Sequence, residues 1–281
     1  MRSTFAGFYI AKSGIDSARA NLDITGQNVS NENVTGYTRQ RVDVYSRGSS
    51  GFNMRYASVG SVAIGEGVNL GGTSQLRDPY LDVRYRREQA KFGKSASELA
   101  TLKDMEYIFD EIAKDGLDTQ FQDFFKQLQN MALNNGDTVS ENILKTSSKM
   151  LVKMFNYCSS QLEKVKLQEY SYLEDSTKRV NEILSGIADL NKQIKEANIG
   201  DNPALELIDS RNMLIDELSG YIPIETQTKL VNIGGGKMVE ELSISLVTNG
   251  VDKFNLVDNL EYRQLGIVKD SEKNIIQPVK L

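Results

Sequence analysis

The side chains that could do chemistry in this chain are almost all carboxylates. They gather in two clusters, Asp110, Glu111, Asp115 and Asp118, and Asp201, Glu206 and Asp209. Paired carboxylates can act as general acid and base or hold a metal ion. The Asp115–Asp118 segment lacks the ligand order of a calcium loop, and helix-borne acids that alternate with bases usually form a solvated surface. We therefore expect neither a metal site nor catalytic residues here.

The composition removes further classes of chemistry. The 281 residues include no histidine and a single cysteine, Cys158. Histidine is the usual proton shuttle near neutral pH, so Ser-His-Asp and Cys-His nucleophilic sites are excluded, as are zinc sites with imidazole or several thiolate ligands. One cysteine cannot form an internal disulfide, and we interpret Cys158 as a small buried apolar residue rather than a reactive thiol. We expect no enzyme activity and no cofactor.

The charge balance and the apolar patterning exclude two classes of partner. With 33 Lys and Arg against 38 Asp and Glu, the net charge is −5, which argues against a nucleic-acid-binding surface. No uninterrupted apolar run reaches about 18 residues, so no membrane insertion is expected. Lys12 and Asp16 interrupt the apolar start of the chain, unlike a cleaved signal peptide. Export of this protein would therefore use a route without one.

The elements that position these residues begin with a helix near the N-terminus. Its mostly apolar residues alternate at steps of three and four, which defines a heptad seam: Phe8, Ala11, Ile15, Ala18, Leu22, Thr25 and Val29. The pattern fits either a core helix of a globular domain or a helix that pairs with a partner helix. Because the seam is narrow and the helix is long, we favour a partner. The assembly seam would then consist of Phe8, Ile15, Leu22 and Val29.

An asparagine-rich segment follows this helix. Asparagine competes for local backbone hydrogen bonds, so three of them followed by a glycine predict a helix end and a shaped turn. These residues are Asn28, Asn31, Asn33 and Gly36. Residues 41–45 then alternate as a short strand. The serine- and glycine-rich stretch 46–74 contains Gly65-Glu66-Gly67, which lacks the order of a phosphate-binding loop, so we interpret it as a flexible linker with one or two short strands.

Helical periodicity returns at Asp78-Pro79, an N-cap followed by a residue suited to the first helical turn. One face of this helix carries Tyr85, Phe92, Leu99, Leu102, Glu106, Phe109 and Ile112 or Ala113, up to Asp115-Gly116. Among the arginines near its start, Arg84, Arg86 and Arg87 lie close to Asp82 and Glu88, which indicates ion pairs or a partner contact. A shorter helix follows with Phe121, Phe124, Phe125, Leu128 and Met131, and Asn134-Asn135-Gly136 ends it.

The longest helix is predicted to run from a capping box, Thr138 to Glu141, to about Ala197. Its seam is Leu144, Ser147, Leu151, Met154, Cys158, Leu162, Val165, Glu169, Tyr172, Val180, Ile183, Ile187, Leu190 and Ile194. About 60 residues rising 1.5 Å each would give a rod of roughly 90 Å. A last helix spans 204–219, with Asn202-Pro203 as its cap and Gly220 as its stop.

The remainder of the chain is β-like. Residues 222–226 and 242–246 alternate, Asn249-Gly250 predicts a hairpin turn, and Gly234-Gly235-Gly236 predicts a loop between two strands. Residues 275–279 read as a strand that stops midway. We therefore expect the chain to be a fragment of a longer protein.

Three motifs in order resemble the flagellar axial proteins, and among them the hook-associated protein 1 family, in its N-terminal portion. The first is an Asn-x-x-Asn-x-Asn-x-x-Gly-Tyr segment: Asn28, Asn31, Asn33, Gly36 and Tyr37, continued by Thr38, Arg39 and Gln40. The second, Gln122 to Gln129, resembles the family's D-F-F-x-x-L-Q helix. The third, Leu207 to Leu218, resembles its L-L-D-x-R-D-x-L-x-x-x-L helix. The likeness covers residues 1 to about 225.

The resemblance implies a mainly α fold: a long-helix coiled-coil bundle like that of flagellin, with a smaller β region at the C-terminal end. It implies four parts: an assembly helix and turn (1–46), a linker (47–77), an elongated helical bundle (78–225) and the start of a β-rich outer domain (226–281). Family members end in a second seam helix, and none follows residue 225. Without it, we expect residues 1–35 to be mobile or domain-swapped and 78–220 to form an independent antiparallel bundle.

The implied function is a structural junction that joins hook to filament, outside the cell, after export without a cleaved signal. Its implied partners are neighbouring copies, the hook protein, the next junction protein, and the export apparatus with its chaperone. Other axial proteins, such as flagellin, hook or rod subunits, are the nearest alternative, and Thr38-Arg39-Gln40 argues against them. A type III secreted coiled-coil tip protein would share the export and the rod, but would not need the asparagine motif.

Overall fold

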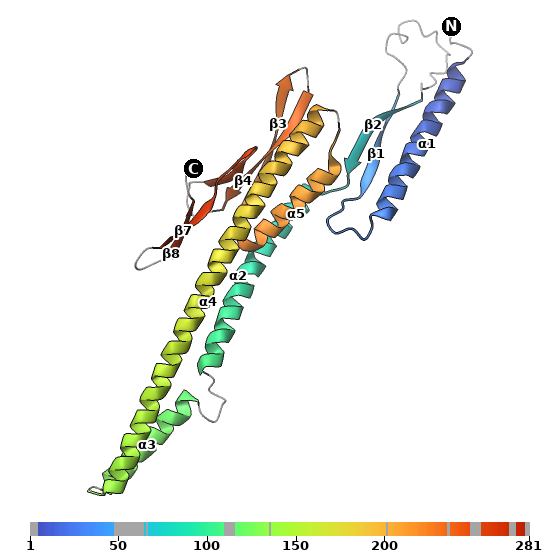
Figure 1. Ribbon diagram of the computed structural model, residues 1–281. Helices are drawn as coiled ribbons and strands as arrows, with labels where there is room; N and C mark the ends of the chain where they lie inside the picture. The colour runs from blue at the N-terminus through green and yellow to red at the C-terminus, as the bar shows by residue number, and fades with distance from the viewer. Residues whose placement is uncertain are drawn as a thin grey trace. The chain divides into compact units, whose positions relative to one another are not determined.

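The chain is mainly α-helical with a smaller antiparallel β region toward its C-terminal end, as the sequence predicts (Figure 1). The computed structural model describes residues 5–47, 65, 67–109, 116–134, 136–200, 202–234, 237–247, 254–269 and 274–278. The helices are α1 (Ala6–Ser30), α2 (Pro79–Phe109), α3 (Leu117–Leu133), α4 (Thr138–Ile199) and α5 (Leu205–Tyr221). The strands are β1 (Gln40–Ser46), β2 (Val68–Gln75), β3 (Ile224–Gly234), β4 (Lys237–Leu246), β5 (Phe254–Asp258), β6 (Glu261–Tyr262), β7 (Leu265–Lys269) and β8 (Asn274–Pro278).

These elements group into two compact units. The first comprises Met1–Arg87, Ile183–Ser219 and Ile224–Arg263, and the second comprises Glu88–Glu182, Gly220–Pro223 and Gln264–Leu281. Both α2 and α4 contribute residues to each unit. The four-part division inferred from the sequence stays a prediction.

All described strand pairs are antiparallel. β1 pairs with β2, and a register shift between Asp43 and Val44 interrupts the ladder. β3, β4, β5 and β6 form a four-stranded sheet in that order, and β7 pairs with β8. The two alternating segments predicted from the sequence do pair, with Ile224 opposite Leu246. The predicted turn residues Asn249 and Gly250, and the glycines 235 and 236, lie outside the described residues.

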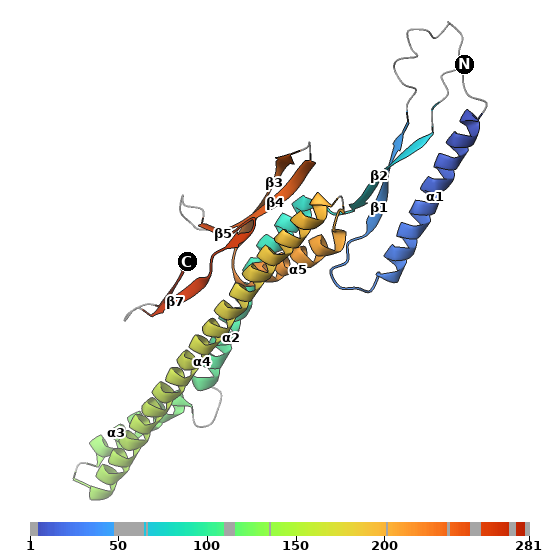
Figure 2. The same ribbon diagram turned by 45° about the horizontal axis from the view of Figure 1, so that its top comes forward.

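The core of the first unit lies between the C-terminal part of α4, α5 and the four-stranded sheet (Figure 2). The apolar side chains that are at most 2% exposed there are Ile183, Leu184, Ile187 and Ile194 of α4, Ile215 and Leu218 of α5, Val239 and Ile244 of β4, and Leu256 and Val257 of β5. Burying one such side chain contributes roughly 1.5–3 kcal/mol. This cluster therefore accounts for much of the hydrophobic stabilisation of the unit.

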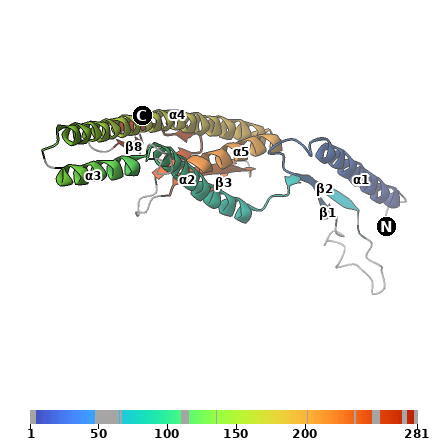
Figure 3. The ribbon, with the colours of Figure 1, turned by 90° about the horizontal axis from the view of Figure 1, so that it is seen from below.

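The second unit is built around the N-terminal part of α4, against which α3 packs (Figure 3). The rings of Phe121 and Phe155 meet edge to face with centroids 5.6 Å apart, and the Ser147 hydroxyl donates to Asp123 at 2.9 Å. α2 is joined to α4 by a hydrogen bond of 3.0 Å from the Thr101 hydroxyl to Glu169. Gly93 of α2 lies so close to the carbonyl oxygen of Gly220 that a Cβ atom would collide with it.

The predicted seam of α4 matches the buried side of the helix with one exception. Cys158 is buried and free, as predicted. Tyr172 is 57% exposed, and Leu173 lies on the more buried side instead. The reason is the drift of a 3.6-residue helix against a seven-residue repeat, which shifts the inward position by one residue after several heptads.

Two helix ends differ from the sequence prediction. Helix α4 begins at Thr138, so the residue before it, Asp137, is the cap: its carboxylate accepts the N–H groups of Val139 and Ser140, each at 3.2 Å. A hydrogen bond from the Ser140 hydroxyl, together with these two backbone bonds, lowers the pKa of Asp137. The predicted capping box from Thr138 is therefore wrong, because an acidic residue one position earlier already binds the free donors. Likewise Gly220 does not stop α5, which ends at Tyr221.

Candidate assembly interface

Helix α1 carries two stripes with seven-residue repeats on opposite faces. One is the predicted seam of Phe8, Ile15, Leu22 and Val29. The other is a stripe of mostly small or polar residues that are buried or half-buried: Ala6, Ile10, Ser13, Ser17, Ala20, Ile24 and Asn28. A shift of two residues turns a helix by about 200°, so the two stripes face apart. The large apolar stripe is the predicted seam, whereas the small stripe was not predicted from the sequence although it has the same seven-residue spacing.

The β1–β2 hairpin covers the small stripe. The Ser13 hydroxyl accepts the N–H of Val68 at 3.1 Å and donates to the carbonyl of Ile10 at 2.8 Å. Gly67 has a left-handed φ of +97°, and a Cβ atom at this position would collide with the Ser13 hydroxyl. Small residues on this face let the strands approach the helix closely.

The seam on the other face is open. Phe8 is 70% exposed, Ile15 68%, Leu22 72% and Val29 67%. The described part of the chain therefore leaves more than half of the surface of each of these four residues exposed. The fold thus separates a face that holds α1 to its own chain from a face that is free to contact another helix.

The asparagine segment fixes the end of α1 to the start of β1. The side-chain amide of Asn28 donates to the carbonyl of Gln40 at 2.8 Å, and its oxygen accepts the Gln40 N–H at 2.9 Å and the Tyr37 hydroxyl at 3.0 Å. Burial raises the pKa of Tyr37, and the nearby carboxylates of Glu206 and Asp209 raise it further. A neutral tyrosine hydroxyl is therefore the state that this contact favours.

The other residues of the motif have distinct places. Asn31 caps the C-terminus of α1, where its N–H and its side-chain amide both donate to the carbonyl of Gln27. Gly36 has a left-handed φ of +83°, and a Cβ atom there would collide with Met213 of α5. Asn33 and Arg39 are exposed. The structure thus brings Asn28, Gly36 and Tyr37 together at one turn, whereas the side chains of Asn33 and Arg39 face solvent.

This turn and the hairpin contact the first turns of α5. The Thr38 N–H donates to the Asp209 carboxylate at 3.0 Å, and the Gln75 side chain donates to the carbonyl of Leu205 at 2.9 Å. A longer contact of 3.5 Å joins Gln27 to Glu206. Two of the motifs in the sequence, around Asn28 and around Asp209, therefore touch in space although about 170 residues separate them.

Helix α5 also binds the rest of the first unit through buried charges. Arg211 donates to Asn191 of α4 at 3.1 Å and to Glu240 of β4 at 3.4 Å. Its burial lowers the pKa of the guanidinium, while Glu240 opposes that shift. Arg86 of α2 donates to Asp216 of α5 at 2.6 Å. The sequence left open whether the arginines near the start of α2 form ion pairs or contact a partner. Arg86 forms an ion pair within the chain.

The predicted apolar face of α2 is exposed, which corrects the expectation that it is buried in a bundle. Tyr85 is 55% exposed, Phe92 68%, Leu99 53% and Leu102 61%. The residues of α2 that turn inward include Arg86, Gly93 and Thr101. As in α1, the helix packs on its own chain through small and polar side chains, because these allow close approach and ion pairing.

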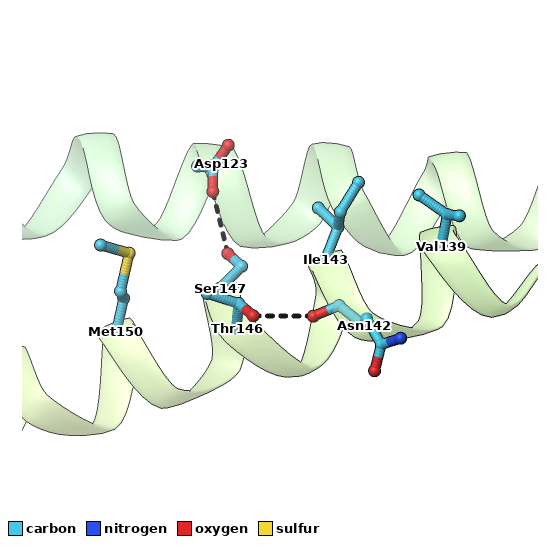
Figure 4. A pocket seen from close by; sticks show the side chains of 7 residues that line it. All are labelled: Asp123, Val139, Asn142, Ile143, Thr146, Ser147 and Met150. Carbon is cyan, nitrogen blue, oxygen red and sulfur yellow. Dashed lines mark hydrogen bonds between the residues drawn. The ribbon is translucent and has the colours of Figure 1, made fainter.

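An open hollow of about 390 Å³ lies where α3 meets the start of α4 (Figure 4). It is lined by Asp123, Val139, Asn142, Ile143, Thr146, Ser147 and Met150. Hydrogen bonds from Gln127 and Ser147 lower the pKa of Asp123. The carboxylate is thus bound by neutral donors and has no second acid beside it in the lining.

The acidic clusters do not form a site within the described part of the chain. Asp110, Glu111, Asp115 and Asp201 lie outside it. Asp209 is buried against Thr38, and no group of three acidic or cysteine ligands that could hold a metal occurs among the described residues. In the same residues, no helix has the length and apolar character needed to span a bilayer.

Comparison with known proteins gives a consistent result. The model for the helical domain of the flagellar hook-associated protein FlgK matches residues 102–278. The flagellar hook-associated protein 1 of Bacillus subtilis (strain 168) is 27% identical over all of this chain and 56% of its own length. That of Escherichia coli (strain K12) is 28% identical over 93% of this chain and 44% of its own length. The chain therefore spans about half the length of these relatives.

A solved structure has the same fold. The flagellar hook junction protein FlgK from Burkholderia pseudomallei covers 70% of this chain and 33% of its own, with a TM-score of 0.53 and 21% sequence identity. The family model covers more than half of the sequence, and its match begins within α2 and extends through α5 into the β region. The chain belongs to the flagellar hook-associated protein FlgK family.

Proposed function

We propose that this protein is a structural junction protein of the bacterial flagellum, which joins hook to filament through helical packing of subunits. The observation that carries the proposal is the open seam of α1, with four large apolar side chains each about two-thirds exposed. Burying such side chains contributes roughly 1.5–3 kcal/mol each, which favours association with another helix. The names of the relatives, hook-associated protein 1 and hook junction protein, support the same role.

The proposed partners are neighbouring copies of the protein, the hook protein and the next junction protein. A helical assembly requires that one surface of a subunit meets a different surface of the next. We assign the seam of Phe8, Ile15, Leu22 and Val29 to that contact. The motif residues Asn28, Asn31, Asn33, Gly36, Tyr37 and Arg39 would shape and flank the turn that holds the seam helix.

We infer further that the role is not catalytic and that the protein acts outside the cell. It would be exported without a cleaved signal, with the help of the flagellar export apparatus and a chaperone. In this proposal, residues 1–46 form the assembly part, 47–77 the linker, 78–225 the helical part and 226–281 the start of an outer domain.

The test uses the full-length protein in cells that lack the wild-type gene. Replacing Ile15 and Leu22 together by glutamate should prevent incorporation at the hook end, because charges would enter the helix contact. The readout is the amount of the protein in purified hook–basal bodies, together with filament formation seen by electron microscopy. Leu230→Glu is the matched control, because Leu230 is 69% exposed but lies on β3. Normal incorporation of the double variant would overturn the proposal.

A further inference from the structure

We propose that Asp209 and Arg211 of α5 form a joint that sets the direction in which α1 presents its seam. The inference rests on the proposed function in one respect only, namely that the seam must point at a partner. The joint itself is a property of the isolated protein.

The element that the joint holds is α1 together with the β1–β2 hairpin, here called the N-terminal module (residues 5–47 and 67–76). Its parts are bound to one another by the contacts of Asn28 with Gln40 and of Ser13 with Val68. It should therefore move as one body. Its direction depends on what it contacts outside itself.

The strongest of these outside contacts is the one to Asp209. The Asp209 side chain is only 6% exposed, and its Oδ2 accepts the Thr38 N–H at 3.0 Å. Its other oxygen, Oδ1, is buried and has no hydrogen-bond partner among the described residues. A hydrogen bond to a carboxylate is stronger than one between neutral groups. Releasing Thr38 would leave the buried carboxylate without this donor, so the bond resists opening.

Arg211 anchors the opposite side of the same helix turn. Two residues along a helix rotate the side chain by about 200°, and Arg211 accordingly binds Asn191 of α4 and Glu240 of β4. Asn191 in turn donates to the carbonyl of Asn259 at 2.7 Å. Asp209 thus faces the N-terminal module while Arg211 faces the core of the unit. The pair transmits the orientation of that core to the module.

The experiment measures distances between nitroxide spin labels by pulsed electron paramagnetic resonance, in the full chain with Cys158 replaced by alanine. One label pair, at Arg19→Cys and Lys192→Cys, reports on α1 against α4. A second pair, at Lys192→Cys and Lys229→Cys, reports on α4 against β3, which the Asp209 contact does not involve. All three sites are exposed and lie in the first unit.

Asp209→Ala should broaden the α1–α4 distance distribution at least twofold and leave the α4–β3 distribution and the helical circular dichroism unchanged. Asp209→Asn, which keeps an acceptor oxygen, should broaden it less. Thr38→Pro removes the donating N–H without altering α5 and should reproduce the effect of Asp209→Ala. Arg211→Lys should broaden both distributions, because a lysine lacks the planar guanidinium that donates to Asn191 of α4 and Glu240 of β4 at the same time.

Ser210→Ala is the matched control, since the Ser210 hydroxyl is exposed and donates only within its own helix, to Glu206. An unchanged α1–α4 distribution in Asp209→Ala, or equal broadening in Ser210→Ala, overturns the joint. Loss of the helical signal in both Asp209→Ala and Thr38→Pro also overturns it, because the contact would then be a requirement of folding. The distances are measured on the isolated protein, outside any flagellum. The outcome for the joint therefore does not depend on whether the seam variants change incorporation in cells.

Discussion

The side-chain amide of Asn28 makes the two hydrogen bonds to Gln40 that a neighbouring strand would make. It donates to the Gln40 carbonyl at 2.8 Å and accepts the Gln40 N–H at 2.9 Å. Asn181 of α4 does the same to Leu265, at 2.9 and 2.8 Å. An amide side chain carries the donor and the acceptor of a peptide group. In both places a helix thereby holds the first residue of a strand.

Replacing Asn28 by alanine should therefore lower the free energy of unfolding by about 1–3 kcal/mol, because the backbone groups of buried Gln40 lose their partners. Urea unfolding followed by circular dichroism measures the change. Asn33→Ala, at an exposed position of the same motif, should change stability by no more than about 0.5 kcal/mol. Equal losses in the two variants would show that the Asn28 contact is not the cause.

Tyr37 should make stability sensitive to alkaline pH. Burial and the carboxylates of Glu206 and Asp209 raise its pKa above the ordinary value of 10.0. The folded chain then holds the phenol proton more tightly than the unfolded chain, so the contribution is complete below pH 10 and decreases as pH rises through the folded pKa. Stability measured from pH 8 to 11 should fall more steeply for the wild type than for Tyr37→Phe. Parallel curves would contradict the assignment.

Gly36→Ala should destabilise the protein for two separable reasons. The left-handed φ of +83° costs an alanine about 1–2 kcal/mol, and the new Cβ atom would also collide with Met213. Gly136→Ala isolates the first cost, since Gly136 has φ of +93° and open space around it. The loss at Gly36 should exceed that at Gly136, and Met213→Ala should reduce the difference. A Gly36 effect that is independent of residue 213 would argue against the contact with α5.

Leu184→Ala should cost about 2–5 kcal/mol of unfolding free energy, because it leaves a cavity in a fully buried site of α4. Tyr172→Ala, on the same helix, should cost about 0.5 kcal/mol or less because Tyr172 is largely exposed. Chemical denaturation of both variants tests the corrected seam of α4. A large loss of unfolding free energy in Tyr172→Ala would contradict the assignment of Tyr172 to the exposed side of α4.

Much of the fold could be predicted because its signals are local. The positions of α1 and α4 follow from heptad spacing, the start of α2 from Asp78-Pro79, and the β3–β4 pairing from two alternating segments. The cap of α4 was misplaced by one residue because Asp137 and Thr138 are both good caps, and only the backbone geometry selects between them.

What the sequence by itself determined is the period of each helix and the three motifs that resemble the family. Period alone does not say which stripe of a helix faces inward, because the Phe8 and Ile10 stripes of α1 both repeat every seven residues. The tertiary structure decides it: the β1–β2 hairpin covers the small stripe, since only small side chains let strands approach the helix closely. In the same way, the contact of Thr38 with Asp209 joins residues 171 positions apart, and no local pattern encodes such a distance.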